Sequence, residues 1–129
     1  MMNTDTADAA RAVSFRDVGD GRVLRGQAGG GGAVTGPACI VHSAVDLAQV
    51  GPGDIAVVEV ADAAWVTRVG DAAGLVAERG GILSNGAIVA RERGLVVVVA
   101  VADATSLIQD GQLLRIDGAT GVVELSNEP

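Results

Sequence analysis

Lysine and tyrosine are absent from this 129-residue chain, and cysteine, histidine, tryptophan and phenylalanine each occur once. All nine basic residues are therefore arginines, and they are scattered along a chain whose formal net charge is −7. Nucleic acids and anionic membranes bind clustered cations, which displace counterions from phosphate groups. The charge distribution predicts that the chain binds neither nucleic acid nor a membrane surface.

The single cysteine, Cys39, excludes an internal disulfide and is typical of a protein from a reducing compartment. No apolar run approaches the ~20 residues that a membrane-spanning helix needs. The first residues contain acids and lack the apolar stretch of a secretory signal, so we expect a cytoplasmic protein. With one cysteine and one histidine, His42, neither a metal site nor a cofactor is expected.

Because aromatic residues are scarce, the core must consist of valine, alanine, isoleucine and leucine. Short apolar or alternating runs predict strands at 22–25, 33–42, 55–60, 74–77, 95–101, 113–117 and 121–125. Helical spacing and capping residues predict helices or helical turns at 43–50, 63–69, 84–93 and 103–108. This mixed order predicts an α/β fold, with a central sheet assembly and a few short helices packed on it.

Glycine and proline are expected to break this pattern at two places. The run Gly29 to Gly32 is not expected inside a stable element, because glycine loses much backbone entropy on folding. Gly36-Pro37 is expected to interrupt the strand at 33–42. We predict one domain over residues 22–129, preceded by a flexible tail or edge element at residues 1–21.

Residues 80–92 carry a long ordered motif, Gly-Gly-Ile-Leu-Ser-Asn-Gly-Ala-Ile-Val-Ala-Arg-Glu. The motif resembles the signature of the phosphohistidine swivelling (mobile) domain of phosphoenolpyruvate (PEP)-utilising enzymes, such as pyruvate phosphate dikinase and PEP synthase. The likeness extends over residues 22–125 and includes Gly53-Asp54-Ile55 and Asp117-Gly118. It implies a swivelling-domain-like β/β/α assembly, in which a histidine carries a phosphoryl group between two distant active sites.

The chain departs from this family at the position of the phosphorylated histidine, which is Asn85 here. Covalent catalysis needs a nucleophilic lone pair, whereas the lone pair of an amide nitrogen is delocalised into its carbonyl. The next alanine of the signature is Gly86, and residues 61–63 replace a Thr-x-Pro that precedes the family's tryptophan, here Trp65. A proline is also lost from the run at 94–100. These departures predict that the chain is not a phosphohistidine phosphotransferase.

The start of the predicted helix at 84–93 is the main candidate site. Its unpaired N–H groups suit an anion, so Ser84 and Asn85 are either simple caps or part of a retained pocket for an anionic or carbonyl ligand. The candidate ligand-binding residues are Gly80, Gly81, Ser84, Asn85, Gly86, Trp65 and Arg91. Arg91 has a structural alternative, which is to tie the helix to a loop.

Catalytic candidates are Asn85, Ser84, Glu59 and Asp62. The two carboxylates are the only general bases that the pattern offers near Trp65, and solvated loop acids are the simpler interpretation. His42 is expected to be an exposed residue at a strand end. Cys39 is expected on the opposite face of the same strand, as a small buried residue, which argues against a Cys–His pair.

Three functions remain open. In the first, the chain is interpreted as a stand-alone domain and acts as a binding or accessory module that docks on a separately encoded protein partner. The second is a small cofactor-free biosynthetic enzyme, of cyclase, dehydratase, isomerase or lyase type, that reuses the pocket at Ser84 and Asn85. The third is a phosphocarrier that uses His42. The loss of the nucleophile and of a nearby hydroxyl favours the first.

Overall fold

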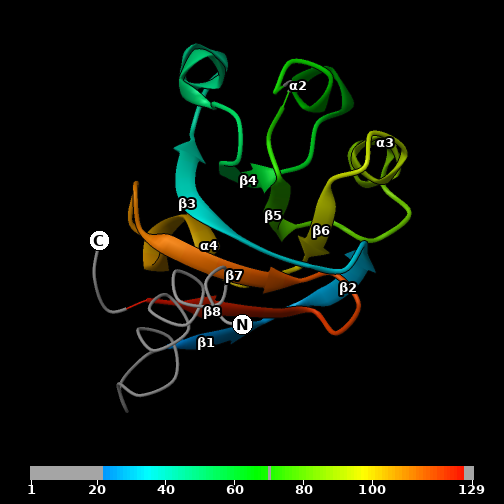
Figure 1. Ribbon diagram of the computed structural model, residues 1–129. Helices are drawn as coiled ribbons and strands as arrows, with labels where there is room; N and C mark the ends of the chain where they lie inside the picture. Colours follow the sequence, from blue (N-terminus) through cyan, green and yellow to red (C-terminus); the bar gives the residue numbers. More distant parts are fainter. Residues whose placement is uncertain (1–21, 70, 127–129) are drawn as a thin grey trace, which may run out of the picture.

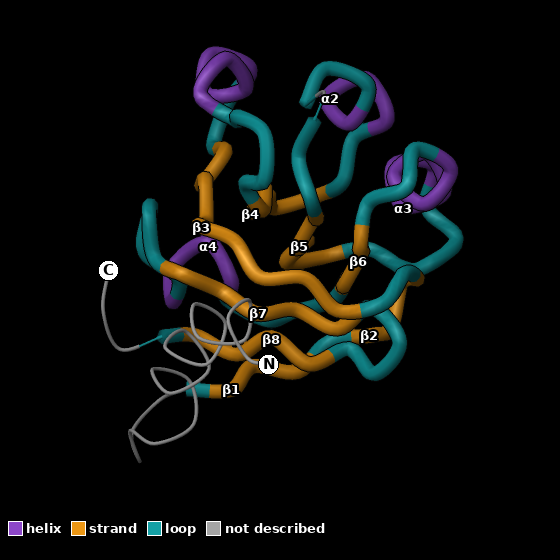
Figure 2. Tube along the Cα trace, viewed as in Figure 1, coloured by secondary structure: helices purple, strands orange, loops and turns teal. Residues whose placement is uncertain are grey.

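The computed structural model describes residues 22–69 and 71–126 (Figures 1 and 2). Its elements in chain order are β1 (Val23–Arg25), β2 (Gln27–Gly30), β3 (Ala33–Val41), η1 (Ala44–Gln49), β4 (Ile55–Val60), α2 (Ala63–Val66), β5 (Gly74–Arg79), α3 (Asn85–Glu92), β6 (Val96–Val99), α4 (Ala104–Leu107), β7 (Leu113–Asp117) and β8 (Val122–Leu125). The tail or edge element expected at residues 1–21 lies outside the described residues. No described helix is long and apolar enough to cross a bilayer.

The strands form two layers, and helices cover one of them. The strand order is β1-β8-β7-β3-β4-β5-β6-β2, in which β3, β4, β5 and β6 pair in parallel and the other pairs are antiparallel. In Figure 1, α2 and α3 lie above the parallel strands, while β7, β8 and β1 lie below them. The predicted α/β fold with a β/β/α sheet assembly is confirmed.

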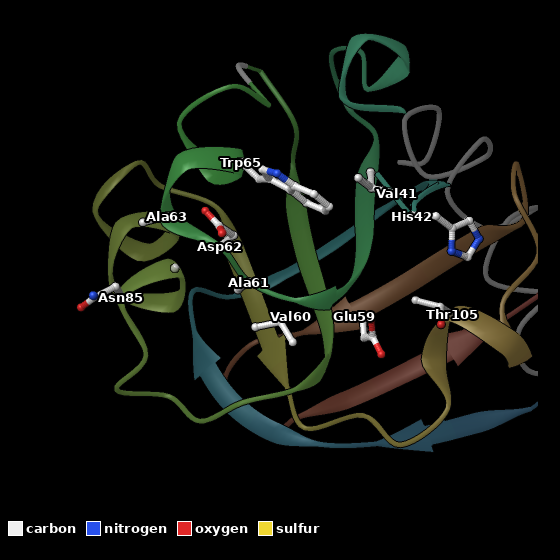
Figure 3. Close-up of a pocket in the computed structure, with 11 residues that line it drawn as sticks. Val41, His42, Glu59, Val60, Ala61, Asp62, Ala63, Trp65, Asn85 and Thr105 are labelled. Carbon is white, nitrogen blue, oxygen red and sulfur yellow. The ribbon is translucent and has the colours of Figure 1, made fainter. Parts of the chain in front are cut away.

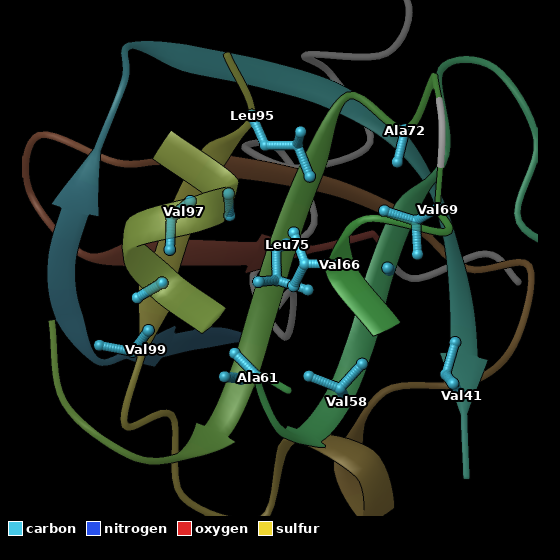
Figure 4. Close-up of a cluster of buried hydrophobic side chains, with 14 of the residues drawn as sticks. Val41, Val58, Ala61, Val66, Val69, Ala72, Leu75, Leu95, Val97 and Val99 are labelled. Carbon is cyan, nitrogen blue, oxygen red and sulfur yellow. The ribbon is translucent and has the colours of Figure 1, made fainter. Parts of the chain in front are cut away.

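The parallel strands are apolar throughout because both of their faces are covered. In β4, Ala56 and Val58 pack in the core between the strands and the helices, and Figure 4 shows Val58 in this core. Their neighbours Ile55 and Val57 point the other way, into the core between the two layers of strands. All four are at most 2% exposed. The alternation of side chains along a strand thus divides one apolar run between two cores.

Gly36 and Pro37 do not interrupt β3, contrary to the prediction. β3 changes partner at this point, because Pro37 is its last residue paired with β7 and Ala38 is its first residue paired with β4. Proline lacks the N–H of a ladder residue, and Pro37 is exposed. A proline is tolerated in the strand because it stands where one ladder ends and the next begins.

The prediction that the glycine run stays outside regular structure is also wrong, because Gly29 and Gly30 belong to β2. β2 pairs with β6, and the register shifts between Ala28 and Gly30. A Cβ atom on Gly29 would lie 2.6 Å from the carbonyl oxygen of Val97, so only glycine allows this close approach. Pairing and packing therefore outweigh the entropy that glycine loses.

The other predicted elements are present, and their ends differ from the prediction by at most two residues except at α2, which ends at Val66 and not at residue 69. Asp117 ends β7, and Gly118 begins the turn that joins it to the antiparallel strand β8. Gly94 has φ +85° and directly follows the C-terminal cap of α3, as expected for a helix stop.

Ala100 provides a test of backbone strain in this fold. It has φ +58°, a left-handed conformation that costs an L-residue about 1–2 kcal/mol. We expect Ala100→Gly to raise the free energy of unfolding by about 0.5–1 kcal/mol, measured by urea denaturation. Ala102→Gly is the matched control, since Ala102 is exposed and is not among the residues with positive φ. It should lower stability slightly, and equal effects at both positions would contradict the interpretation.

Candidate functional site

An open cleft of about 670 Å³ lies at the carboxyl ends of the parallel strands β3 and β4, beside the start of α3. Ligands of open α/β sheets bind in this kind of position, because loops and helix starts converge there. Figure 3 shows the lining residues, which are Val41, His42, Glu59, Val60, Ala61, Asp62, Ala63, Trp65, Asn85, Gly86 and Thr105. We take this cleft as the candidate site.

The close approach of two chain segments forms one wall of the cleft. Gly86, in the first turn of α3, is buried against Ala61, which follows β4. A Cβ atom at position 86 would lie 2.0 Å from the carbonyl oxygen of Ala61. The alanine that stands here in the signature would therefore force these segments apart. Gly86 is a packing requirement of this chain as well as a lining residue.

Ser84 and Asn85 have separate roles at the start of α3. Ser84 is the N-cap, and its Oγ accepts a hydrogen bond from the backbone N–H of Ala87 at 3.3 Å. Ser84 does not line the cleft, so its place in the structure agrees with the capping interpretation. Asn85 is exposed at the rim, and in Figure 3 its amide points away from the other labelled side chains.

Both carboxylates of the cleft already have partners. Asp62 is the N-cap of α2, and its Oδ1 accepts a hydrogen bond from the backbone N–H of Ala64 at 2.8 Å. Glu59 forms an ion pair with Arg79, and both side chains are more than half exposed. Sequence reasoning placed Glu59 and Asp62 near the site, and the structure does bring them together with Asn85 and Trp65.

His42 lines the same cleft, although 43 positions separate it from Asn85 in the sequence. It directly follows β3, and Asp46 Oδ2 accepts its backbone N–H at 2.9 Å. Figure 3 shows His42 and Asn85 at opposite ends of the labelled group. The sequence signal that places His42 at the cleft is its position at a strand end. The ends of neighbouring parallel strands meet at one edge of a sheet, and the cleft lies at that edge.

Thr105 is a lining residue that sequence reasoning did not identify. Its hydroxyl and its backbone N–H both donate to Glu78 Oε1, at 2.6 and 2.9 Å. The hydroxyl bond, the backbone bond and the charge of Arg79 together hold the pKa of Glu78 below its ordinary value, against a smaller opposing effect of burial. Thr105 thus links α4 to the end of β5.

Besides Ser84, three candidate ligand residues lie outside the cleft lining, namely Gly80, Gly81 and Arg91. Arg91 is half-buried, and its Nη1 donates to the carbonyl oxygen of Gly29 at 2.9 Å. Arg91 therefore ties α3 to the strand β2, whereas the structural alternative predicted from the sequence was a tie to a loop. Gly30 has φ +125°, a conformation that favours glycine, and a Cβ atom there would also lie 2.5 Å from Arg91 Cδ.

Cys39 is buried and takes no part in the cleft. Burial is the main reason that the pKa of its thiol is raised, and the carboxylates of Asp110, Asp54 and Asp46 add to the shift. His42 is exposed at the end of its strand, whereas Cys39 is buried. Within residues 22–69 and 71–126, no group of three or more acidic, histidine or cysteine side chains could hold a metal ion.

A family model described as the mobile domain of PEP-utilising enzymes matches residues 50–121. The chain belongs to this family. A rifampicin phosphotransferase from Streptomyces sp is 43% identical over 109 residues, which cover 84% of this chain and 12% of that protein. The mobile domain described here thus spans about an eighth of the length of that relative. The resemblance in residues 80–92 predicted the family correctly.

Solved structures agree with the fold of the mobile domain. Aconitase X from Thermococcus kodakaraensis superposes with a TM-score of 0.59 at 18% identity, covering 81% of this chain and 98% of that chain. A solution structure of Enzyme I superposes with a TM-score of 0.54 at 23% identity, covering 61% of this chain and 33% of that chain. At these identities the likeness establishes the fold alone.

The structural role of Arg91 is tested by Arg91→Met, which keeps an unbranched side chain and removes the donor. A hydrogen bond from a charged group is worth about 1.5–3 kcal/mol, so we expect a loss of about 1.5–2 kcal/mol in the free energy of unfolding. Arg93→Met is the control, because Arg93 is exposed on the same helix end, and it should change stability by less than about 0.5 kcal/mol. Similar losses for both variants would refute the tie between α3 and β2.

The bond between Thr105 and Glu78 predicts a pH dependence of stability. A carboxyl group whose pKa is lower in the folded state stabilises the fold above its unfolded pKa, and this stabilisation is lost as the pH falls through the folded pKa. Thr105→Val removes the hydroxyl donor. The stability difference between wild type and Thr105→Val should therefore be largest above about pH 5 and shrink towards pH 3. Denaturant titrations across this range measure it, and a constant difference would contradict the assignment.

Proposed function

We propose that this mobile domain acts as a binding module that docks on a protein partner and carries no phosphoryl group. The main support is Asn85, which replaces the nucleophilic histidine of the family at the rim of the cleft. An amide can donate and accept hydrogen bonds, but it cannot form the covalent intermediate of phosphotransfer. The fold of the family is retained around position 85, whereas the nucleophilic side chain is absent from it.

The cleft also offers little to an enzyme that reuses it. A general base needs a carboxylate that is free to take a proton from a substrate. Asp62 is occupied in part by the cap of α2, and Glu59 is held by Arg79. The hydroxyl of Thr105 is committed to Glu78. A docking role needs none of these groups to react. It needs only a surface that a partner can reach, and the open cleft provides one.

A phosphorylation assay tests the proposal. Wild type, Asn85→His and His42→Gln are incubated with labelled PEP and a pyruvate phosphate dikinase variant that lacks its own phosphorylated histidine. We expect no acid-labile phosphate on wild type or on His42→Gln, because no competent nucleophile stands at position 85. Label on Asn85→His, mapped by mass spectrometry, would show that the donor reaches the cleft.

Stoichiometric label on His42 of the wild-type protein would overturn the proposal in favour of a phosphocarrier. The enzyme alternative is tested separately by a thermal-shift screen with phosphate, PEP, carboxylates and carbonyl compounds. A ligand at ~100 times its Kd stabilises by about 2.7 kcal/mol, which is measurable. Strong binding that Asn85→Ala abolishes would favour a small-molecule enzyme over docking.

A further inference from the structure

The charges that line the cleft are of one sign. Among the described residues that line it, Glu59 and Asp62 are the acids, and no arginine is present. Arg79 compensates the charge of Glu59. Within the part of the chain that the structure describes, the carboxylate of Asp62 is bonded to the neutral N–H of Ala64 and to no cation. A carboxylate has about four acceptor sites, so Asp62 retains capacity for a further donor. The cleft is therefore acidic, on a chain whose formal net charge is −7.

The partial positive charge at the start of α3 opposes the charge of these carboxylates. The relative size of the two charges decides whether the cleft favours a cation or an anion. A helix N-terminus is equivalent to about half a positive charge, which is spread over the first turn. Asp62 alone carries a full negative charge, and Glu59 adds a second that a solvent-exposed arginine offsets. The sum favours a cation in the cleft over a phosphate or carboxylate group.

Trp65 adds a second feature that suits a cation. It is half-buried, packs against the core between helices and strands, and lines the cleft in the turn of helix that Asp62 caps. Figure 3 shows its indole extending over the labelled group beside Asp62. The face of an indole attracts guanidinium and ammonium groups, and arginine stacks on it more often than lysine does.

We propose that the cleft receives an arginine side chain from the surface of a partner protein, held by Asp62 and stacked on Trp65. This inference rests on the proposed docking function and specifies the chemistry of the partner. The planar guanidinium donates in a fork that matches a carboxylate, and its flat face fits an indole. A cleft of about 670 Å³ leaves room for this side chain and for the backbone that carries it.

Trp65 is the only tryptophan of the chain, so its fluorescence reports on the cleft directly. The intact protein is titrated with N-acetyl-arginine amide and with N-acetyl-citrulline amide, which has nearly the same shape and no charge. We expect a saturable change with the arginine probe, a weaker response with citrulline, and a rising Kd with added salt. Two-dimensional NMR of the Trp65 indole N–H measures the same binding if the fluorescence does not respond.

Asp62→Asn removes the charge while keeping a good N-cap, so it should leave the fold intact. We expect it to weaken binding of the arginine probe about fivefold, as for the loss of an exposed ion pair. Glu92→Gln is the matched control, because it removes one exposed acid of α3 outside the cleft. It should leave the Kd within about twofold of wild type, since distant surface charges are screened.

Equal binding of arginine and citrulline, equal effects of Asp62→Asn and Glu92→Gln, or tighter binding of inorganic phosphate than of the arginine probe would each overturn the inference. These results leave the docking function standing if the wild-type protein also takes up no phosphate from PEP. Phosphate on His42 would instead remove the proposed function itself. The two failures are thus distinguished by different measurements on the same protein.

Discussion

Burial of the parallel strands on both faces is the constraint on which the rest of this structure depends. β4, β5 and β6 are covered by helices on one side and by antiparallel strands on the other, so their side chains alternate between two cores. Apart from Trp65, which packs against the core beneath the helices, both cores depend on close packing of valine, alanine, leucine and isoleucine. The same parallel arrangement brings the ends of β3 and β4 to one edge, where the cleft lies.

Several residues of the signature around position 85 have structural roles in this chain. Ser84 caps α3, Arg91 bonds to the carbonyl oxygen of Gly29, and Gly94 ends the helix with positive φ. Each of these residues holds α3 in place against the sheet. Each of these structural roles belongs to a residue other than Asn85.

The cleft combines a neutral amide at position 85 with an acidic lining. Among the described residues, its lining carries the carboxylates of Glu59 and Asp62 and no arginine, beside a helix start of weaker positive charge. On this basis we propose that the site favours a cation over a phosphoryl group. A neutral amide at position 85 and an acidic lining are consistent with each other, and both are consistent with recognition of a basic partner surface.

The sequence alone determined the family, the α/β class and most elements, because apolar runs, caps and the motif at residues 80–92 are local signals. It also identified Glu59, Asp62, Trp65 and Asn85 as candidates. Only the tertiary structure decided that β2 includes Gly29 and Gly30 and that β3 runs through Pro37, because both depend on which strand pairs alongside.

The tertiary structure likewise decided that His42 and Thr105 join the cleft, while Gly80, Gly81 and Arg91 do not line it. The physical reason is the same in each case. Propensity and periodicity act over a few residues, whereas the partner of a strand and the lining of a cleft are set by contacts between segments that are tens of residues apart. Arg91 and Gly29, 62 positions apart in the chain, form one such contact.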